Sequence, residues 1–119
     1  MKKLVIVEPD SGLSWLMCES LRGAGYEPVP CAAEQAVALA AELPADALIA
    51  SLMAASVEQS PLYRALREDP RTKALPVIII TGRGDRTVRR RLGETPPHLL
   101  FKPFELEGLV AAVKQVLGD

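Results

Sequence analysis

The chain has 119 residues, of which 49% are hydrophobic and 24% are charged, with a formal net charge of −1. This length and this apolar share suffice for one packed core, so we expect a single domain over residues 1–119. The near-neutral charge balance argues against nucleic acid or an anionic membrane as a partner, because neither would be attracted by an overall field.

The first residues, Met1-Lys2-Lys3, lead into a short apolar run that an acid and a proline end at once. We therefore expect no signal peptide, no membrane span and a cytoplasmic protein. The two cysteines, Cys18 and Cys31, are expected to be buried small hydrophobic residues and not a disulfide framework. The single histidine, His98, offers no metal-ligand spacing, and no metal is predicted.

Five apolar segments have the length and composition of strands: Leu4–Val7, Tyr26–Cys31, Ala47–Ala50, Val77–Ile80 and His98–Phe101. The runs are continuous, as expected when helices cover both faces of a parallel sheet. Within Tyr26–Cys31, Pro28 and Pro30 lie two residues apart, so one side of that strand lacks two N–H donors. That side should face solvent, which predicts an edge strand.

Helical patterns separate these strands, at about Asp10–Ala24, Ala33–Leu43, Ser60–Glu68, Asp85–Leu92 and Glu105–Leu117. The first starts near Asp10 or Ser11 and ends at Gly23 or Gly25. Its predicted apolar stripe is formed by Leu13, Leu16, Met17, Ser20, Leu21 and Ala24. Five strand–helix repeats predict an α/β fold with a doubly wound parallel sheet.

In such folds the site lies beyond the carboxyl ends of the strands. The side chains to examine there are Glu8, Pro9, Asp10, Ser51, Leu52, Thr81, Gly82 and Lys102.

Seven segments carry a family resemblance: Lys3–Asp10, Gly25-Tyr26, Asp46–Met53, Glu68-Asp69-Pro70-Arg71, Leu75-Pro76-Val77, Thr81-Gly82 and Lys102-Pro103-Phe104. In this order and spacing they resemble the receiver domain of two-component response regulators, the CheY-like family, over nearly the whole chain. The resemblance implies a five-stranded flavodoxin-like sheet with strand order 2-1-3-4-5. It also implies a role in two-component or phosphorelay signal transduction.

The resemblance further implies a phosphorylation pocket. In the family, two acids after the first strand and a phosphoacceptor aspartate at the end of the third strand hold Mg²⁺. A threonine and a lysine then hold the phosphoryl oxygens. Glu8, Thr81 and Lys102 match this pattern in the present chain, and Lys102-Pro103 is a candidate cis peptide.

Three positions depart from the pattern. Pro9 replaces the second acid, Ser51 replaces the phosphoacceptor, and Leu99 replaces the aromatic switch residue of the fifth strand. Mg²⁺ usually needs one or two carboxylates, and Asp10 is a poorer ligand candidate than Glu8. A serine hydroxyl is a far weaker nucleophile than a carboxylate unless a base activates it. We therefore expect no acyl phosphate, no tightly held metal and no cofactor.

The retained residues have alternative roles. Lys102 either forms an ion pair with Glu8 or keeps a place for a phosphoryl group. Ser51 is either a small polar pocket residue or the target of a Ser/Thr kinase. Thr81 is expected to form a local hydrogen bond with no switching role.

Two surface features suggest a partner. Trp15 lies off the predicted apolar stripe and either anchors a partner or folds flat over its neighbours. The fourth helix carries Arg86, Arg89, Arg90 and Arg91, which form a solvated face, a surface for an acidic protein or a contact for nucleic acid. We expect a protein partner at the face of the fourth helix, fifth strand and fifth helix, or at the first helix, and no nucleic acid or membrane.

The sequence therefore predicts a pseudo-receiver: a signalling module that is not an enzyme and acts through protein–protein interaction without phosphotransfer. One alternative is a receiver phosphorylated at an unusual acceptor. Another is a ligand binder on the same fold. Binding of FMN is disfavoured because the acidic Glu8-Pro9-Asp10 turn would repel its phosphate. Binding of cobalamin is disfavoured because it would need a histidine in a strand–helix loop, and His98 is not in one.

Overall fold

The computed structural model describes residues 1–52, 59–82 and 98–119. Its elements in chain order are β1 Lys3–Val7, α1 Ser11–Gly23, β2 Glu27–Pro30, α2 Ala33–Glu42, β3 Ala47–Leu52, α3 Gln59–Glu68, β4 Val77–Thr81, β5 Leu99–Phe101 and α5 Leu106–Leu117. The strands form one five-stranded parallel sheet in the order β2-β1-β3-β4-β5. The predicted fold class and strand order are confirmed.

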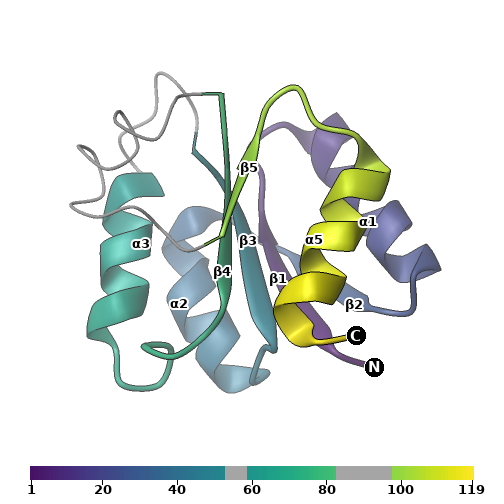
Figure 1. Ribbon diagram of the computed structural model, residues 1–119. Helices are drawn as coiled ribbons and strands as arrows, with labels where there is room; N and C mark the ends of the chain where they lie inside the picture. The colour runs from purple at the N-terminus through teal and green to yellow at the C-terminus, as the bar shows by residue number, and fades with distance from the viewer. Residues whose placement is uncertain (53–58, 83–97) are drawn as a thin grey trace.

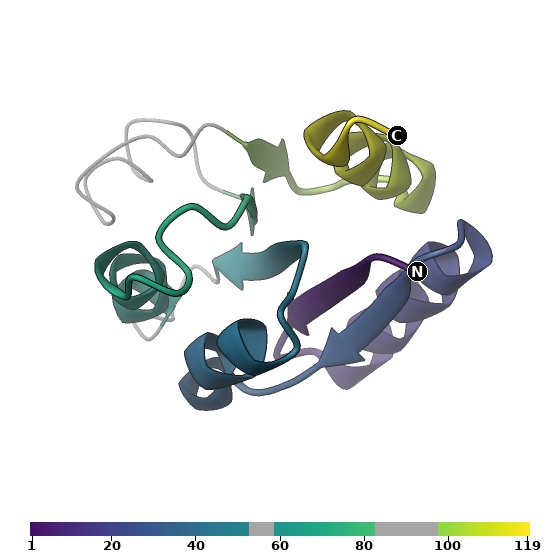
Figure 2. The ribbon, with the colours of Figure 1, turned by 90° about the horizontal axis from the view of Figure 1, so that it is seen from below.

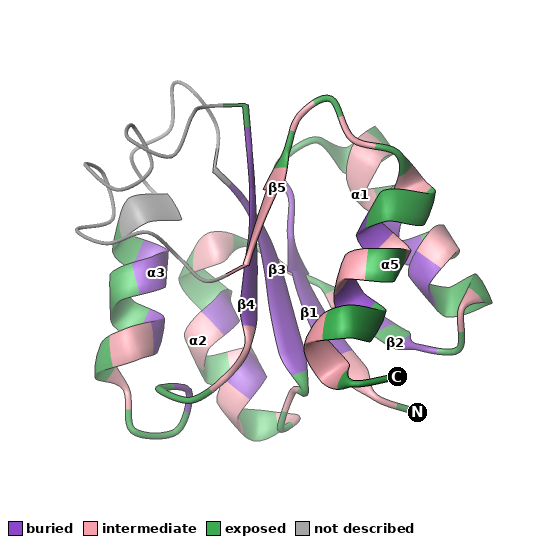
Figure 3. Cartoon of the chain, viewed as in Figure 1, coloured by how far each residue is buried: buried purple, intermediate pink, exposed green. Residues whose placement is uncertain are grey.

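The sheet is the central layer, with α1 and α5 on one face and α2 and α3 on the other (Figures 1 and 2). Alternate residues of each strand point to opposite faces. In β1, Leu4 and Ile6 pack toward α1 and α5, while Val5 and Val7 pack toward α2 and α3. Both faces of a central strand are therefore buried (Figure 3), which explains the continuous apolar runs.

The edge position of β2 follows from its two prolines. The N–H groups of Glu27 and Cys31 donate toward β1, to Lys2 O at 2.9 Å and to Ile6 O at 3.0 Å. Pro28 and Pro30 alternate with these donors, so their nitrogens face away from β1, where no further strand is paired within the described part of the sheet. The edge-strand prediction is confirmed, and the strand is one residue shorter at each end than predicted.

Helix α1 begins where the sequence predicts and buries most of the predicted stripe, with Leu16 as the exception. Asp10 caps it by accepting a hydrogen bond from Leu13 N at 3.0 Å. Leu16 is 45% exposed, whereas Cys18 is buried beside Met17 and Leu21. The prediction of Leu16 in the buried stripe is therefore wrong. The reason is tertiary: α1 packs against both α5 and the edge strand β2, which turns Cys18 inward and Leu16 outward.

The remaining helices agree with their patterns. Helix α2 ends one residue earlier than predicted, and α3 begins one residue earlier. Helix α5 buries Leu109 and Val113, which lie on the predicted face. The predicted fourth helix, Asp85–Leu92, lies outside the described residues.

Candidate functional site

The candidate site lies at the carboxyl ends of the strands, and the sheet register brings its residues together. Val7 pairs with Ala50, so Glu8, one residue on, is level with Ser51. Leu52 pairs with Thr81, and Thr81 pairs with Phe101, the residue before Lys102. Residues far apart in the sequence thus meet at one edge of the sheet.

Glu8 is the centre of this site. Its side chain is fully buried, as is Ser51. One carboxylate oxygen, Oε1, accepts a hydrogen bond from the Ser51 hydroxyl. The other, Oε2, accepts from the backbone N–H of Asp10 at 2.9 Å. Both oxygens therefore have a protein donor, as a buried carboxylate requires.

Lys102 provides the positive charge. Its Nζ lies 3.7 Å from Glu8 Oε1, and its side chain is about one-third exposed at 31%. The predicted Glu8–Lys102 ion pair is present. Thr81 is fully buried next to it, and the Thr81 carbonyl accepts a hydrogen bond from the Lys102 backbone N–H at 2.8 Å. The Lys102–Pro103 peptide bond is cis, as the resemblance implies.

The donor set does not fit Mg²⁺. Pro9 is exposed and brings no side-chain oxygen. Asp10 directs Oδ1 to Leu13 N as the cap of α1, and both oxygens of Glu8 accept protein hydrogen bonds. Within residues 1–52, 59–82 and 98–119, no three acidic, histidine or cysteine side chains are grouped to hold a metal ion.

The remaining predicted residues fall into two groups. Leu99 is half-buried in β5, and Trp15 is 62% exposed on α1. The degree of exposure favours the reading of Trp15 as an open surface residue over a ring folded flat. Arg86, Arg89, Arg90 and Arg91 lie outside the described residues, so their surface stays a prediction.

Sequence reasoning missed two features of this region. The hydrogen bond from Ser51 to Glu8 depends on the register between β1 and β3, which a single sequence does not specify. The exposure of Leu16 next to Trp15 depends on the rotation of α1. For the hydrogen bond, the advance signal was the placement of Glu8 and Ser51 after two predicted strands; no signal in the sequence indicated the exposure of Leu16.

Among the residues that the structure describes, no helix has the length and apolar character needed to cross a membrane.

Comparison with known proteins identifies the family. No family model matches the chain. The phosphate regulon transcriptional regulatory protein PhoB of Rhizobium meliloti is 34% identical over 120 residues, covering 98% of this chain and 52% of PhoB. The chain thus spans about half the length of that relative. A chemotaxis protein CheY of Rhizobium etli is 28% identical over 119 residues, covering 98% of this chain and 92% of that protein.

One solved structure is similar to this chain over nearly the full length of both proteins. A protein described as a response regulator, from Chloroflexus aurantiacus, superposes with a TM-score of 0.85 and 32% identity, covering 99% of this chain and 98% of that one. The strand order, the site at the strand ends and this full-length similarity lead to one conclusion. The chain belongs to the CheY-like receiver-domain family of response regulators.

Proposed function

We propose that this chain is a receiver domain that signals without phosphorylation, by binding a protein partner. The observation that carries the proposal is the state of Glu8. Its carboxylate accepts hydrogen bonds from Ser51 and Asp10 and pairs with Lys102, so the charges of the pocket balance one another internally. A phosphoryl group would have to break these contacts without a carboxylate acceptor or a bound Mg²⁺ in exchange.

The same observation argues against catalysis at this site. A serine nucleophile needs a base that takes its proton. Here the Ser51 hydroxyl donates to the Glu8 carboxylate, which also accepts the backbone N–H of Asp10 and pairs with Lys102, so these three partners already engage the carboxylate. We therefore propose a binding role and no enzymatic activity for the domain.

The proposed partner surface includes the exposed side of α1. Trp15 is 62% exposed and Leu16 is 45% exposed, and they are adjacent in sequence. An exposed tryptophan next to an exposed leucine is an effective anchor for a protein partner. The arginines of residues 86–91 remain a second proposed surface, for an acidic partner.

The test is titration of the isotope-labelled domain with beryllofluoride and Mg²⁺, observed by NMR. The expected result is no saturable shift at Ser51, Thr81 or Lys102. Saturable shifts at these three residues would mean that the pocket accepts a phosphoryl group, and would favour a receiver with an unusual acceptor.

Two variants make this test sharper. Ser51→Asp alone should bind beryllofluoride weakly, because Pro9 still denies the metal a second acid. Pro9→Asp combined with Ser51→Asp should bind it measurably better. Equal binding by the single and the double variant would contradict the role assigned to Pro9.

A further inference from the structure

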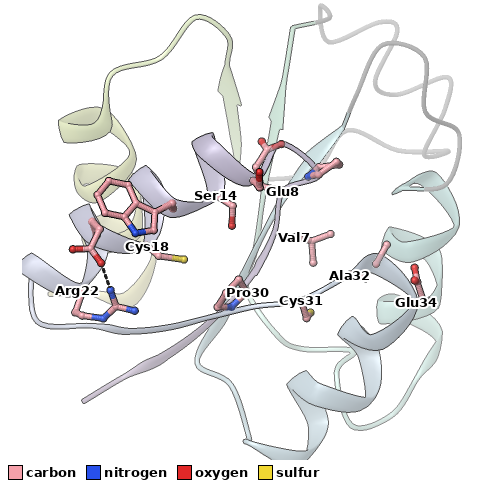
Figure 4. Close-up of a pocket in the computed structure, with 14 residues that line it drawn as sticks. Val7, Glu8, Ser14, Cys18, Arg22, Pro30, Cys31, Ala32 and Glu34 are labelled. Carbon is pink, nitrogen blue, oxygen red and sulfur yellow. Dashed lines mark hydrogen bonds and ion pairs between the residues drawn. The ribbon is translucent and has the colours of Figure 1, made fainter.

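A second concave site lies beside the pocket, over the edge strand. It is a groove of about 920 Å³ between α1, the end of β2 and the start of α2. In Figure 4, Cys18 and Arg22 of α1 lie opposite Pro30, the last residue of β2, and Cys31 after it, and Ala32 and Glu34 continue the wall into α2. This volume lies within the range of about 300–1,000 Å³ that is typical of sites for small organic ligands.

One complete face of α1 forms the first wall. The lining residues recur at spacings of three and four, which places them on one side of a helix: Ser11, Ser14, Trp15, Cys18, Glu19 and Arg22. This face is distinct from the one that packs on the sheet through Met17 and Leu21. The groove therefore arises because α1 turns a second, partly apolar face toward the edge of the sheet.

The surface of the groove is mostly apolar. Val7 and Cys18 form buried parts of it, and Pro30, Ala32 and Trp15 add exposed apolar surface. An apolar wall with an exposed indole ring suits a ligand with an aliphatic or aromatic body.

The charged residues that line the groove indicate which ligand charge it would attract. Three carboxylates, Glu8, Glu19 and Glu34, line it together with one guanidinium, that of Arg22. Glu8 pairs with Lys102, and Arg22 forms an ion pair with Glu19. Glu34 has no hydrogen bond or ion pair within the part of the chain that the structure describes.

The negative charge of Glu34 affects the pKa of the Cys31 thiol. Burial raises the pKa of Cys31, and the nearby negative charge of Glu34 raises it further. Cys31 and Glu34 both line the groove, so the Glu34 carboxylate can act on a charged group inside it.

We propose that this groove binds a small organic cation with an apolar or aromatic body. The cation faces Glu34, and the body lies against Trp15, Cys18 and Pro30. The groove shares Glu8 with the pocket at the strand ends and Trp15 with the proposed partner surface, but binding of the cation requires neither phosphorylation nor its absence.

The probe is 2-phenylethylamine, which is a cation at pH 7, compared with the anion 3-phenylpropionate and the neutral 3-phenylpropanamide. Trp15 is the only tryptophan, so tryptophan fluorescence reports the groove directly. Amide NMR shifts at Cys18 and Cys31 provide a second readout. The cation should give saturable changes in both and bind about tenfold more tightly than the anion, because the exposed Glu34 charge attracts the cation and repels the anion.

The Glu34→Gln variant should weaken binding of the amine about threefold and leave the amide unchanged. Glu42→Gln is the matched control, because it removes a carboxylate from the same helix α2 at a position outside the groove. Its affinity for the amine should equal that of the wild type.

Three results would overturn the proposal. The first is no saturable change with any of the three compounds. The second is a lack of charge dependence, seen either as equal affinity for the amine and the carboxylate or as an unchanged affinity for the amine in Glu34→Gln. The third is binding of a lysine-rich peptide in the groove without binding of 2-phenylethylamine, which would identify a protein segment as the occupant.

Discussion

At the scale of single residues, the Glu8 carboxylate connects three other residues of the site. It accepts hydrogen bonds from Ser51 and Asp10 and pairs with Lys102, although it contributes no exposed side-chain surface. Each of these partners depends on Glu8 differently. Ser51 is buried and would lose its acceptor, whereas Lys102 is partly exposed and can turn to water.

We expect Glu8→Ala to lower the free energy of unfolding by about 2–3 kcal/mol. Most of the loss comes from the unsatisfied Ser51 hydroxyl and Asp10 N–H, since the Lys102 ammonium group is partly exposed and can be solvated by water instead. Urea denaturation measures the change. The control Glu107→Gln, an exposed acid of α5, should stay within about 0.5 kcal/mol of the wild type. If Glu8→Ala combined with Ser51→Ala costs as much as the two single changes together, the proposed coupling between them is absent.

At the scale of elements, the start of α1 shows how a residue near the site serves the helix and not the pocket. Asp10 follows Pro9 in the acidic turn, but its Oδ1 accepts from Leu13 N at 3.0 Å. The carboxylate caps the helix and occupies the positive end of its dipole. The turn therefore holds α1 in place against β2 and α5.

We expect Asp10→Ala to destabilise the domain by about 1 kcal/mol, the usual cost of a lost N-cap. Asp10→Asn should recover most of that stability, because its amide oxygen can accept the same hydrogen bond. Thermal unfolding followed by circular dichroism measures both. A loss in Asp10→Asn as large as that in Asp10→Ala would show that the charge, and not the cap, matters.

At the scale of the whole molecule, the two ends of the chain are held together at the N-terminal side of the sheet. Asp119 accepts a hydrogen bond from Tyr26 OH at 2.7 Å and one from Lys2 Nζ at 2.5 Å. Lys2, through its hydrogen bond, is the main cause of the lowered pKa of Asp119, followed by Tyr26. Burial, and then the hydrogen bond and charge of Asp119, raise the pKa of Tyr26 to about 12.

This shift predicts a loss of stability at high pH. The folded chain keeps the Tyr26 proton up to about pH 12, whereas the unfolded chain releases it near the ordinary phenol pKa of 10.0. The stability from the neutral phenol is thus complete below about pH 10 and declines as pH rises from 10 toward 12. Tyr26→Phe should cost about 1 kcal/mol at pH 8.

Across pH 10–12 the variant should lose less additional stability than the wild type, as measured by urea denaturation at each pH. Absorbance titration should show one high-pH phenol transition in the wild type that the variant lacks. A Tyr26 transition near pH 10 would contradict the buried hydrogen bond to Asp119.

Much of the architecture follows from the sequence itself. Continuous apolar strands need helices on both faces of the sheet to bury their side chains. Pro28 and Pro30 lack the N–H groups that a central strand would donate to its neighbours. Asp10 before an apolar helical pattern predicts a helix start. These features depend on the local chemistry of the backbone and on side-chain periodicity, so they can be read without knowing the neighbours in space.

The tertiary structure alone decided which groups meet. Glu8 and Ser51 form a hydrogen bond because β1 and β3 are neighbours in one particular register, although 43 positions separate them. Cys18, not Leu16, is buried because α1 lies against the edge strand as well as α5. The groove between α1, β2 and α2 arises from the same packing. A contact between distant segments is a property of how rigid elements pack, and no local pattern in the chain specifies it.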